Sequence, residues 1–198
     1  MTPTHPADAA MQRLLEGNQR YRSGQAVHPR ANAERRSEIA HSQKPFAMIL
    51  GCVDSRVPPE LIFDCGLGDL FVIRSAGQAL DRAVLGSLEF GVAELHIPLL
   101  VVLGHEKCGA VIATIEAIEH NAQAQGNIQA LVEAIRPAVE QAHAQGSPLL
   151  ESAVQANILL GIAALKRSGV LGEATRKGEL KIVGAHYSLA SGLVEIVA

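Results

Sequence analysis

The sequence predicts an α/β fold: a single domain with a mainly parallel four-stranded sheet plus an edge strand, flanked by helices. Four continuous apolar runs, typical of strands buried on both faces, alternate with segments of helical spacing, and this alternation favours a parallel sheet. The composition agrees with this fold class. Of the residues, 48% are hydrophobic and none is Trp, so an aliphatic core is expected. A length of 198 residues suits one well-buried domain, and a second full domain is not expected.

The first half of the chain contains three expected helices and two expected strands. An apolar stripe from Met11 to Tyr21 predicts the first helix, and Asp81 is a plausible N-cap for the third. The helices are expected over residues 8–22, 32–41 and 81–95. The strands are continuous apolar runs over residues 46–51 and 70–73.

The second half repeats the alternation. A third apolar strand is expected over residues 99–103 and a fourth over 180–184, and Gly192 separates the fourth from a short terminal strand, 193–197, as in an edge hairpin. Helices are expected after Cys108, over residues 127–144, and along the stripe Val154, Ile158, Ile162 and Leu165.

Composition also limits the class of protein and its location. A net charge of −3 argues against a nucleic-acid surface, because such surfaces carry a clustered basic excess. The sequence has no run of about 18 apolar residues, so no membrane span is expected. The first eight residues do not resemble a secretory signal. Three cysteines are too few for a disulfide framework, so we expect a reducing, cytoplasmic location with cysteines used as ligands.

Two short motifs follow the first and third expected strands. One runs from Cys52 to Arg56 and the other from His105 to Cys108. Sites in parallel sheets form outside the carboxyl ends of the strands, so these motifs can meet if the two strands are neighbours. Two thiols and one imidazole suit a tetrahedral zinc ion that keeps one position open for water. Gly109, the residue after Cys108, lets the backbone pass close to such a metal.

Asp54 and Arg56 complete the predicted chemistry. Two thiolates and a neutral imidazole cancel the charge of zinc, so groups beyond the ligands are needed to activate a bound water. Asp54 is placed to accept a hydrogen bond from zinc-bound hydroxide, and Arg56 can hold its carboxylate through a bidentate pair. In the alternative, Asp54 binds zinc directly, displaces the water and closes the site.

The combined motifs resemble the β-class carbonic anhydrases. The matching residues are Cys52-x-Asp54-Ser55-Arg56, the run from Gly68 to Gly77, and His105-x-x-Cys108-Gly109. Leu15 to Tyr21 looks like the N-terminal helix of that family, and Val183 to Val194 looks like its closing strands. The resemblance therefore covers most of the chain.

The resemblance implies one Zn²⁺ per subunit, bound by Cys52, His105 and Cys108, with Asp54 and Arg56 as a catalytic dyad. It also implies a homodimer or a dimer of dimers with interfacial active sites. In this reading residues 1–45 form an N-terminal helical arm that crosses onto the partner, and residues 46–198 form the α/β zinc-binding core. Gln43 is expected to hold substrate across the interface, and Gly109 is the other candidate substrate-binding residue.

The implied activity is the reversible hydration of carbon dioxide to bicarbonate by zinc-bound hydroxide, a lyase reaction. Hydrolysis of carbonyl sulfide or carbon disulfide at the same zinc site is the alternative. A non-catalytic module, with zinc closed by Asp54, is a third reading.

Three positions depart from the family pattern. Ser75 and Gln78 stand where the family often has Asn, and Ile49 stands where some bacterial members have a Trp that holds inhibitory bicarbonate. That regulatory pocket is therefore not expected here in its usual form. Cys65 has no ligand-type spacing to the other cysteines and is expected to be a structural or free thiol.

Overall fold

A computed structural model describes residues 5–145 and 149–198 of the chain. The strands are β1 (Ala47–Cys52), β2 (Leu70–Ser75), β3 (Leu99–His105), β4 (Lys181–Tyr187) and β5 (Val194–Ile196). The helices are α1 (Pro6–Arg22), α2 (Ala33–Glu38), α3 (Pro59–Ile62), α4 (Arg82–Ala93), α5 (Gly109–Glu119), α6 (Ile128–Gln145), α7 (Leu149–Arg167) and α8 (Gly169–Arg176), with a 3-10 turn, η1 (Ala76–Gln78), after β2.

The five strands form one sheet in the order β2-β1-β3-β4-β5. The first four strands are parallel, and β5 pairs with β4 in the antiparallel sense. The expected fold class, four parallel strands plus an edge strand, is therefore confirmed. Strands β1 and β3 are direct neighbours, with Gly51 opposite Leu103, so the carboxyl ends that carry Cys52 and His105 lie side by side.

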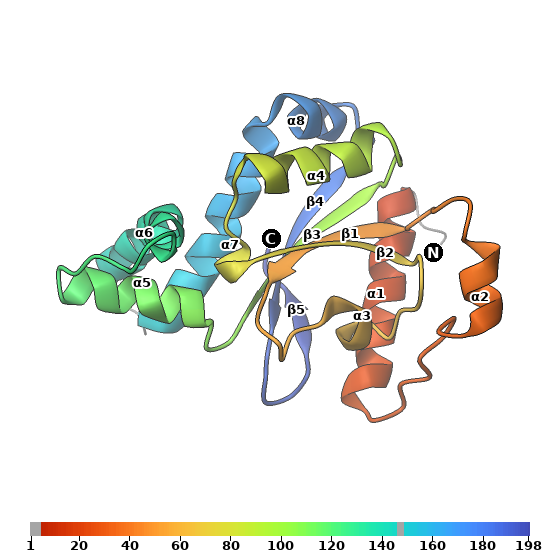
Figure 1. Ribbon diagram of the computed structural model, residues 1–198, viewed down its shortest axis with the longest axis horizontal. Helices are drawn as coiled ribbons and strands as arrows, with labels where there is room; N and C mark the ends of the chain where they lie inside the picture. Colours follow the sequence, from red (N-terminus) through yellow and green to blue (C-terminus); the bar gives the residue numbers. More distant parts are fainter. Residues whose placement is uncertain (1–4, 146–148) are drawn as a thin grey trace.

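Helices cover both faces of this sheet (Figure 1). On one face α4 packs against β2 and α7 packs against β3 and β4, with α8 between these helices; α1 and α3 lie on the other face. Both central strands, β1 and β3, are buried along their whole length, as their unbroken apolar runs predict. Helices α5 and α6 pack on each other and on α7 at one end of the molecule.

Two glycines let α7 approach the sheet closely. A Cβ atom on Gly104 would lie 2.6 Å from Cδ1 of Ile158, and one on Gly184 would lie 2.7 Å from Cγ2 of the same residue. Real Cβ atoms are not found that close to a carbon atom, so only glycine fits at these positions unless Ile158 moves. Gly104 directly precedes His105, and the packing of α7 therefore reaches the edge of the predicted site.

The first helix of the predicted arm packs on its own chain. Ala7, Ala10 and Leu14 are buried in the same core as the sheet. The side-chain amide of Asn18 donates to the carbonyl of Gly192, and its oxygen accepts from the amide of Val194. The division of the chain at residue 45 and the crossing of an arm onto a partner stay predictions.

Two short helices were not expected from the sequence. Helix α3 begins after Pro58 and is only four residues long, too short to show a period. Helix α8 contains Gly169 and Gly172, which weaken the helical signal; Gly172 is needed because a Cβ there would collide with the carbonyl of Lys166. The other expected elements are present, with bounds that differ by a few residues.

One described helix, α7, has the length and composition of a membrane-spanning segment. It contacts β3, β4, α6 and α8, and residues including Ala153, Ile158 and Leu165 are buried against them. Apolar helices in protein cores meet the same criteria of length and composition. The expectation that the chain does not enter a membrane stays a prediction.

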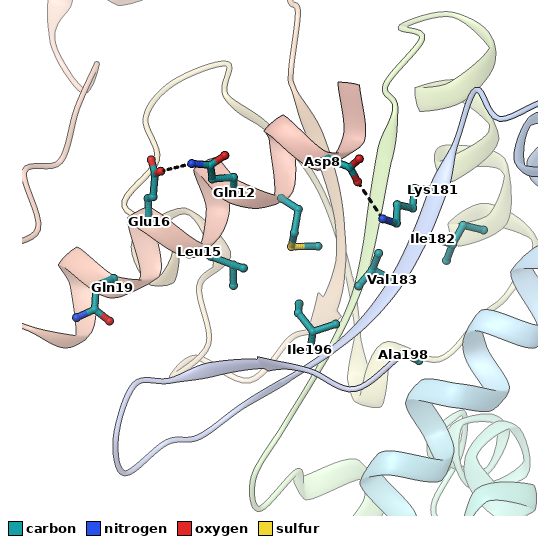
Figure 2. A pocket seen from close by; sticks show the side chains of 11 residues that line it. Asp8, Gln12, Leu15, Glu16, Gln19, Lys181, Ile182, Val183, Ile196 and Ala198 are labelled. Atoms are coloured by element: carbon teal, nitrogen blue, oxygen red, sulfur yellow. Dashed lines mark hydrogen bonds and ion pairs between the residues drawn. The ribbon is translucent and has the colours of Figure 1, made fainter. Parts of the chain in front are cut away.

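A wide groove of about 770 Å³ lies between α1 and the β4–β5 edge of the sheet (Figure 2). Met11 and Leu15 line it from the helix, and Val183 and Ile196 line it from the sheet. At one end, Asp8 and Lys181 form an ion pair of 2.9 Å. No residue of the two motifs lines this groove, so it is separate from the site that the sequence predicts.

Candidate metal centre

Three side chains from the two motifs converge at the carboxyl end of the sheet. Cys52 ends β1, His105 ends β3, and Cys108 is the N-cap residue of α5. Their candidate ligand atoms all lie within 4.8 Å of one another, and all three residues are buried. Among the described residues, this is the one group of His, Cys, Asp and Glu side chains with such geometry. We refer to these three residues as the ligand cluster.

The ligand cluster fits a zinc ion. Two sulfurs bound to one tetrahedral zinc at about 2.3 Å lie roughly 3.8 Å apart, and the sulfurs of Cys52 and Cys108 are 4.0 Å apart. Nε2 of His105 is buried and has no hydrogen-bond partner. Such an orphaned polar atom is costly without a ligand, so a metal would satisfy it.

The ring of His105 is already set in the tautomer that a metal needs. Its Nδ1 lies 2.8 Å from the backbone carbonyl of Glu106. A carbonyl only accepts, so Nδ1 carries the proton and Nε2 keeps its lone pair free. Histidine ligands in metal sites commonly use a carbonyl in this way to fix the ring.

The two thiols of the cluster are hydrogen-bonded to each other, with 4.0 Å between their sulfurs. The hydrogen bond from Cys108 lowers the pKa of Cys52 to about 4, although burial acts in the opposite direction. The same contact, together with burial, raises the pKa of Cys108. The amide of Gly77 also donates to the Cys52 sulfur at 3.3 Å. Because metal ligands of this kind bind as thiolates, these contacts suit the pair to bind a cation.

Asp54 lies two residues after Cys52, and Arg56 holds it. Nε of Arg56 donates to Oδ1 at 2.9 Å and Nη2 donates to Oδ2 at 2.6 Å, a bidentate pair, while the amide of Arg56 donates to Oδ1 as well. This contact keeps the pKa of Asp54 well below its usual range. Asp54 is not part of the ligand cluster, and both its carboxylate oxygens pair with Arg56.

Arg74 is a site residue whose role the sequence analysis did not identify. It lies opposite Gly51 in the β1–β2 register. Its Nε donates to the carbonyl of Cys52 at 2.7 Å and its Nη2 to the carbonyl of Asp54 at 2.6 Å. Arg74 therefore fixes the backbone on both sides of Val53. The sequence offered one indication of this role, because Arg74 is a charged residue at the end of the apolar run over residues 70–73.

Gln43 is not brought into the ligand cluster of its own chain. It is exposed and precedes β1, whereas Cys52 ends that strand. A six-residue strand is about 17 Å long, so the two residues lie toward opposite ends of it. Gly109 begins α5 next to Cys108, and a Cβ atom there would meet no atom within 4 Å. A substrate role for either residue stays a prediction.

The three departures from the family pattern lie around the cluster. Ile49 is buried in β1, and the hydroxyl of Ser75 donates to the carbonyl of Ala79. Gln78 is buried with a positive φ of 46°, and its side-chain oxygen has no partner. One backbone group of the turn from Ser75 to Gln78, the amide of Gly77, donates to the Cys52 sulfur.

Comparison with known proteins agrees with this geometry. A family model described as carbonic anhydrase matches residues 47–194. Carbonic anhydrase 2 of Mycobacterium tuberculosis is 42% identical over 193 residues, which cover 97% of this chain and 93% of that protein. A carbonic anhydrase of Mycolicibacterium smegmatis is 40% identical over 189 residues, covering 95% of this chain and 92% of the relative.

Solved structures show the same fold. The β-carbonic anhydrase CcaA superposes with a TM-score of 0.72 at 29% identity and covers 95% of this chain and 98% of its own. The Coccomyxa β-carbonic anhydrase in complex with acetazolamide gives a TM-score of 0.74 at 26% identity, covering 93% and 84%. One of two tetrameric enzymes from Sordaria macrospora gives 0.75 at 21% identity, with 96% and 98% covered, which shows the fold alone.

Proposed function

This chain belongs to the β-class carbonic anhydrase family, and from that premise we propose that it catalyses the reversible hydration of carbon dioxide with one zinc ion per subunit. The reaction makes it a carbon–oxygen lyase. One observation carries the proposal: the two sulfurs and the unpartnered imidazole nitrogen that converge from β1, β3 and the start of α5.

Cys52, Cys108 and Nε2 of His105 would hold the metal. Bound zinc supplies a Lewis acid that lowers the pKa of a coordinated water, so that this water can attack carbon dioxide near neutral pH. The cluster supplies three donors, one fewer than zinc usually takes, so a water would be able to bind as well. Arg56 holds both oxygens of Asp54, so the carboxylate would not be offered as a fourth donor.

We assign Asp54 the task of orienting the attacking water. Its carboxylate is kept ionised by the bidentate pair, and it can accept a hydrogen bond from a water beside the ligand cluster. Arg56 aims the carboxylate, and Arg74 aims the backbone that carries it. Val53, which separates Cys52 from Asp54, is 53% exposed, so this segment lies at the surface of the protein.

We further propose a homodimer or a dimer of dimers with active sites at the interface. The substrate role proposed for Gln43 would need such an interface, because Gln43 is exposed and lies toward the far end of β1 from the ligand cluster of its own chain. A reducing compartment such as the cytoplasm is proposed from the three cysteines, all of them free. Two of these thiols belong to the ligand cluster, which an oxidising environment would disable.

Metal analysis combined with stopped-flow hydration assays tests the proposal. We expect one zinc per chain, together with rapid carbon dioxide hydration that is lost on chelation and restored by zinc. Carbonyl sulfide and carbon disulfide should be offered to the same preparation. Turnover of a sulfur substrate without carbon dioxide hydration would move the assignment to hydrolysis. Stoichiometric zinc with no turnover would favour a structural zinc site.

A further inference from the structure

Glu106 lies between the ligand His105 and the turn that joins β4 to β5. Its Oε2 accepts a hydrogen bond from the amide of Leu189 at 2.8 Å, and its Oε1 accepts from the hydroxyl of Ser188 at 3.1 Å. Its own amide donates to the carbonyl of Tyr187 at 3.0 Å. A charged side chain between the two ligands His105 and Cys108 thus points away from the cluster, into a turn about 80 residues further along the chain.

The peptide of Glu106 also orients the ligand. Its carbonyl is the group that accepts the proton on Nδ1 of His105, 2.8 Å away. A carbonyl can orient a ring only as well as its own peptide plane is held. Here the amide of the same residue is anchored on Tyr187 at the end of β4 and its side chain on the turn that follows, so the Cα atom from which the carbonyl extends is held from two sides.

The turn that receives Glu106 is itself anchored. Asn18 of α1 contacts the backbone of Gly192 and Val194, and the hydroxyl of Tyr21 lies 3.2 Å from that of Tyr187. The hydrogen-bonded chain therefore runs from α1 through the β4–β5 turn and Glu106 to His105. None of these contacts involves a ligand atom of the cluster.

We propose that Glu106 is a positioning residue of the metal centre, whose carboxylate, anchored on the β4–β5 turn, fixes the carbonyl that orients the His105 ring. This inference rests on the proposed zinc-dependent function. The alternative is that Glu106 only ties two loops together and has no effect on the metal. Both readings predict some loss of stability on substitution, so the deciding measurement is metal binding.

Glu106→Gln separates the two readings with little change in size. The amide oxygen of Gln can still accept from the amide of Leu189, but the hydroxyl of Ser188 must then turn to accept from the NH₂ group, and both hydrogen bonds lose the charge of the carboxylate. The anchor of Glu106 is therefore weakened while the three ligands stay in place. Losses of groups that orient metal ligands commonly weaken metal affinity about 10- to 100-fold.

The test measures zinc dissociation constants by chelator competition in the wild type, Glu106→Gln and Glu116→Gln. Glu116 is exposed on α5, so its variant makes the same chemical change away from the anchored turn. Ser188→Ala, which removes one of the contacts, is the milder variant and should shift affinity in the same direction by less. Cobalt(II)-substituted samples report ligand geometry through their absorption bands.

We expect zinc to bind Glu106→Gln about 10- to 100-fold more weakly, with altered cobalt bands, while Glu116→Gln matches the wild type. Wild-type affinity and unchanged bands in Glu106→Gln would overturn the inference, even if the metal-free variant melts at a lower temperature. Wild-type zinc binding and carbon dioxide hydration are measured first in the same series. A failure of the proposed function would therefore be seen in the wild type, before any variant is compared.

Discussion

Two clusters among the described residues differ in how well their buried hydrogen-bonding groups are satisfied. The ligand cluster at the carboxyl end of the sheet leaves Nε2 of His105 without a partner. The second cluster, which we call the arginine–aspartate network, is formed by Asp64 and Asp69 with Arg13, Arg20 and Arg30. It ties α1 and the segment after it to the connection between α3 and β2.

Every buried carboxylate of the network has several donors. Asp69 accepts from Arg13, from Arg30 and from the amide of Gly66. Asp64 accepts from Arg20 and from the amides of Val27 and His28. Burial would raise the pKa of both carboxyls, but these donors outweigh it and lower the pKa.

The difference separates a structural cluster from a functional one. Buried polar groups in folded proteins are nearly always hydrogen-bonded, so a saturated network needs no ligand to explain it. An orphaned nitrogen beside two thiols does need one. The comparison predicts that substitutions in the ligand cluster remove metal and activity, whereas substitutions in the network change stability and leave the metal in place.

The largest effect is expected for Cys108→Ala. Removing one of three ligands should abolish stoichiometric zinc and reduce carbon dioxide hydration to the background rate. Part of the stability should be lost as well, because metal binding energy is partly folding energy. Zinc is measured by elemental analysis and stability by thermal melting with and without a chelator.

Cys65→Ala is the matched control for that variant. The Cys65 thiol donates to the carbonyl of Phe63 and lies outside the ligand cluster, and burial raises its pKa to about 12, so it is a poor metal ligand at neutral pH. We expect full zinc content and turnover. Loss of zinc from this variant, or its retention in Cys108→Ala, would refute the assignment of ligands.

Asp54→Asn should have the next largest effect. Asn is neutral and has one acceptor oxygen where Asp has two, so in either orientation its NH₂ group faces a donor nitrogen of Arg56. A loss of about 10²- to 10⁴-fold in kcat is expected, as for other removed acid–base groups, with zinc still bound. Stopped-flow assays on zinc-quantified protein check this. Asp81→Asn, at the N-cap of α4, serves as control, and full activity in Asp54→Asn would contradict the role of the dyad.

Asp69→Asn should destabilise the fold by about 1–3 kcal/mol at neutral pH, because the amide cannot satisfy both arginines. The pKa of Asp69 is lower in the folded chain than in the unfolded one. Its stabilising effect is therefore present above the unfolded value, about 3.9, and is lost as the pH falls through the lower folded value.

Denaturant unfolding of wild type and Asp69→Asn from pH 7 to pH 3 measures this dependence. The difference in free energy of unfolding should be constant near neutral pH and should shrink below about pH 4. Zinc content should be unchanged. A difference that grows on acidification would show that the network does not act through an ionised carboxylate.

The smallest effect is expected at an exposed ion pair. Glu38 lies 3.3 Å from Arg35 in α2, and the side chain of Glu38 is 65% exposed. Glu38→Gln should change the free energy of unfolding by less than about 0.5 kcal/mol. The same denaturant titration at low and high salt measures it. A cost as large as that of Asp69→Asn would mean that burial is not what distinguishes the network.

The sheet and the ligand cluster could be predicted because they depend on local patterns. Apolar runs identify β1 and β3, and parallel strands bring their carboxyl ends together, so Cys52 and His105 are expected to meet before any contact is known. The roles of Arg74 and Glu106 could not be predicted in this way. Arg74 depends on its register against Gly51, and Glu106 on a turn about 80 residues away.

Other features were hidden for different physical reasons. The glycines of α8 suppress its helical signal, although Gly172 is required by a close backbone contact. Gln78 is buried and has a positive φ in the turn after β2. Glutamine has no preference for this conformation, so the sequence could not predict it. The proposed role of Gln43 requires a second subunit, and the pattern of one chain does not predict contacts between subunits.

The closeness of α7 to Gly104 makes two positions share one volume. Ile158 occupies the space that a side chain at position 104 would need. The combined volume of the two side chains is therefore fixed, whereas the volume of each one alone is not. Related sequences that carry Ala or Ser at position 104 should therefore compensate with a shorter residue at position 158. Related sequences with a side chain at position 104 and a residue as large as Ile at position 158 would have to shift α7 and, with it, the end of β3 that carries His105.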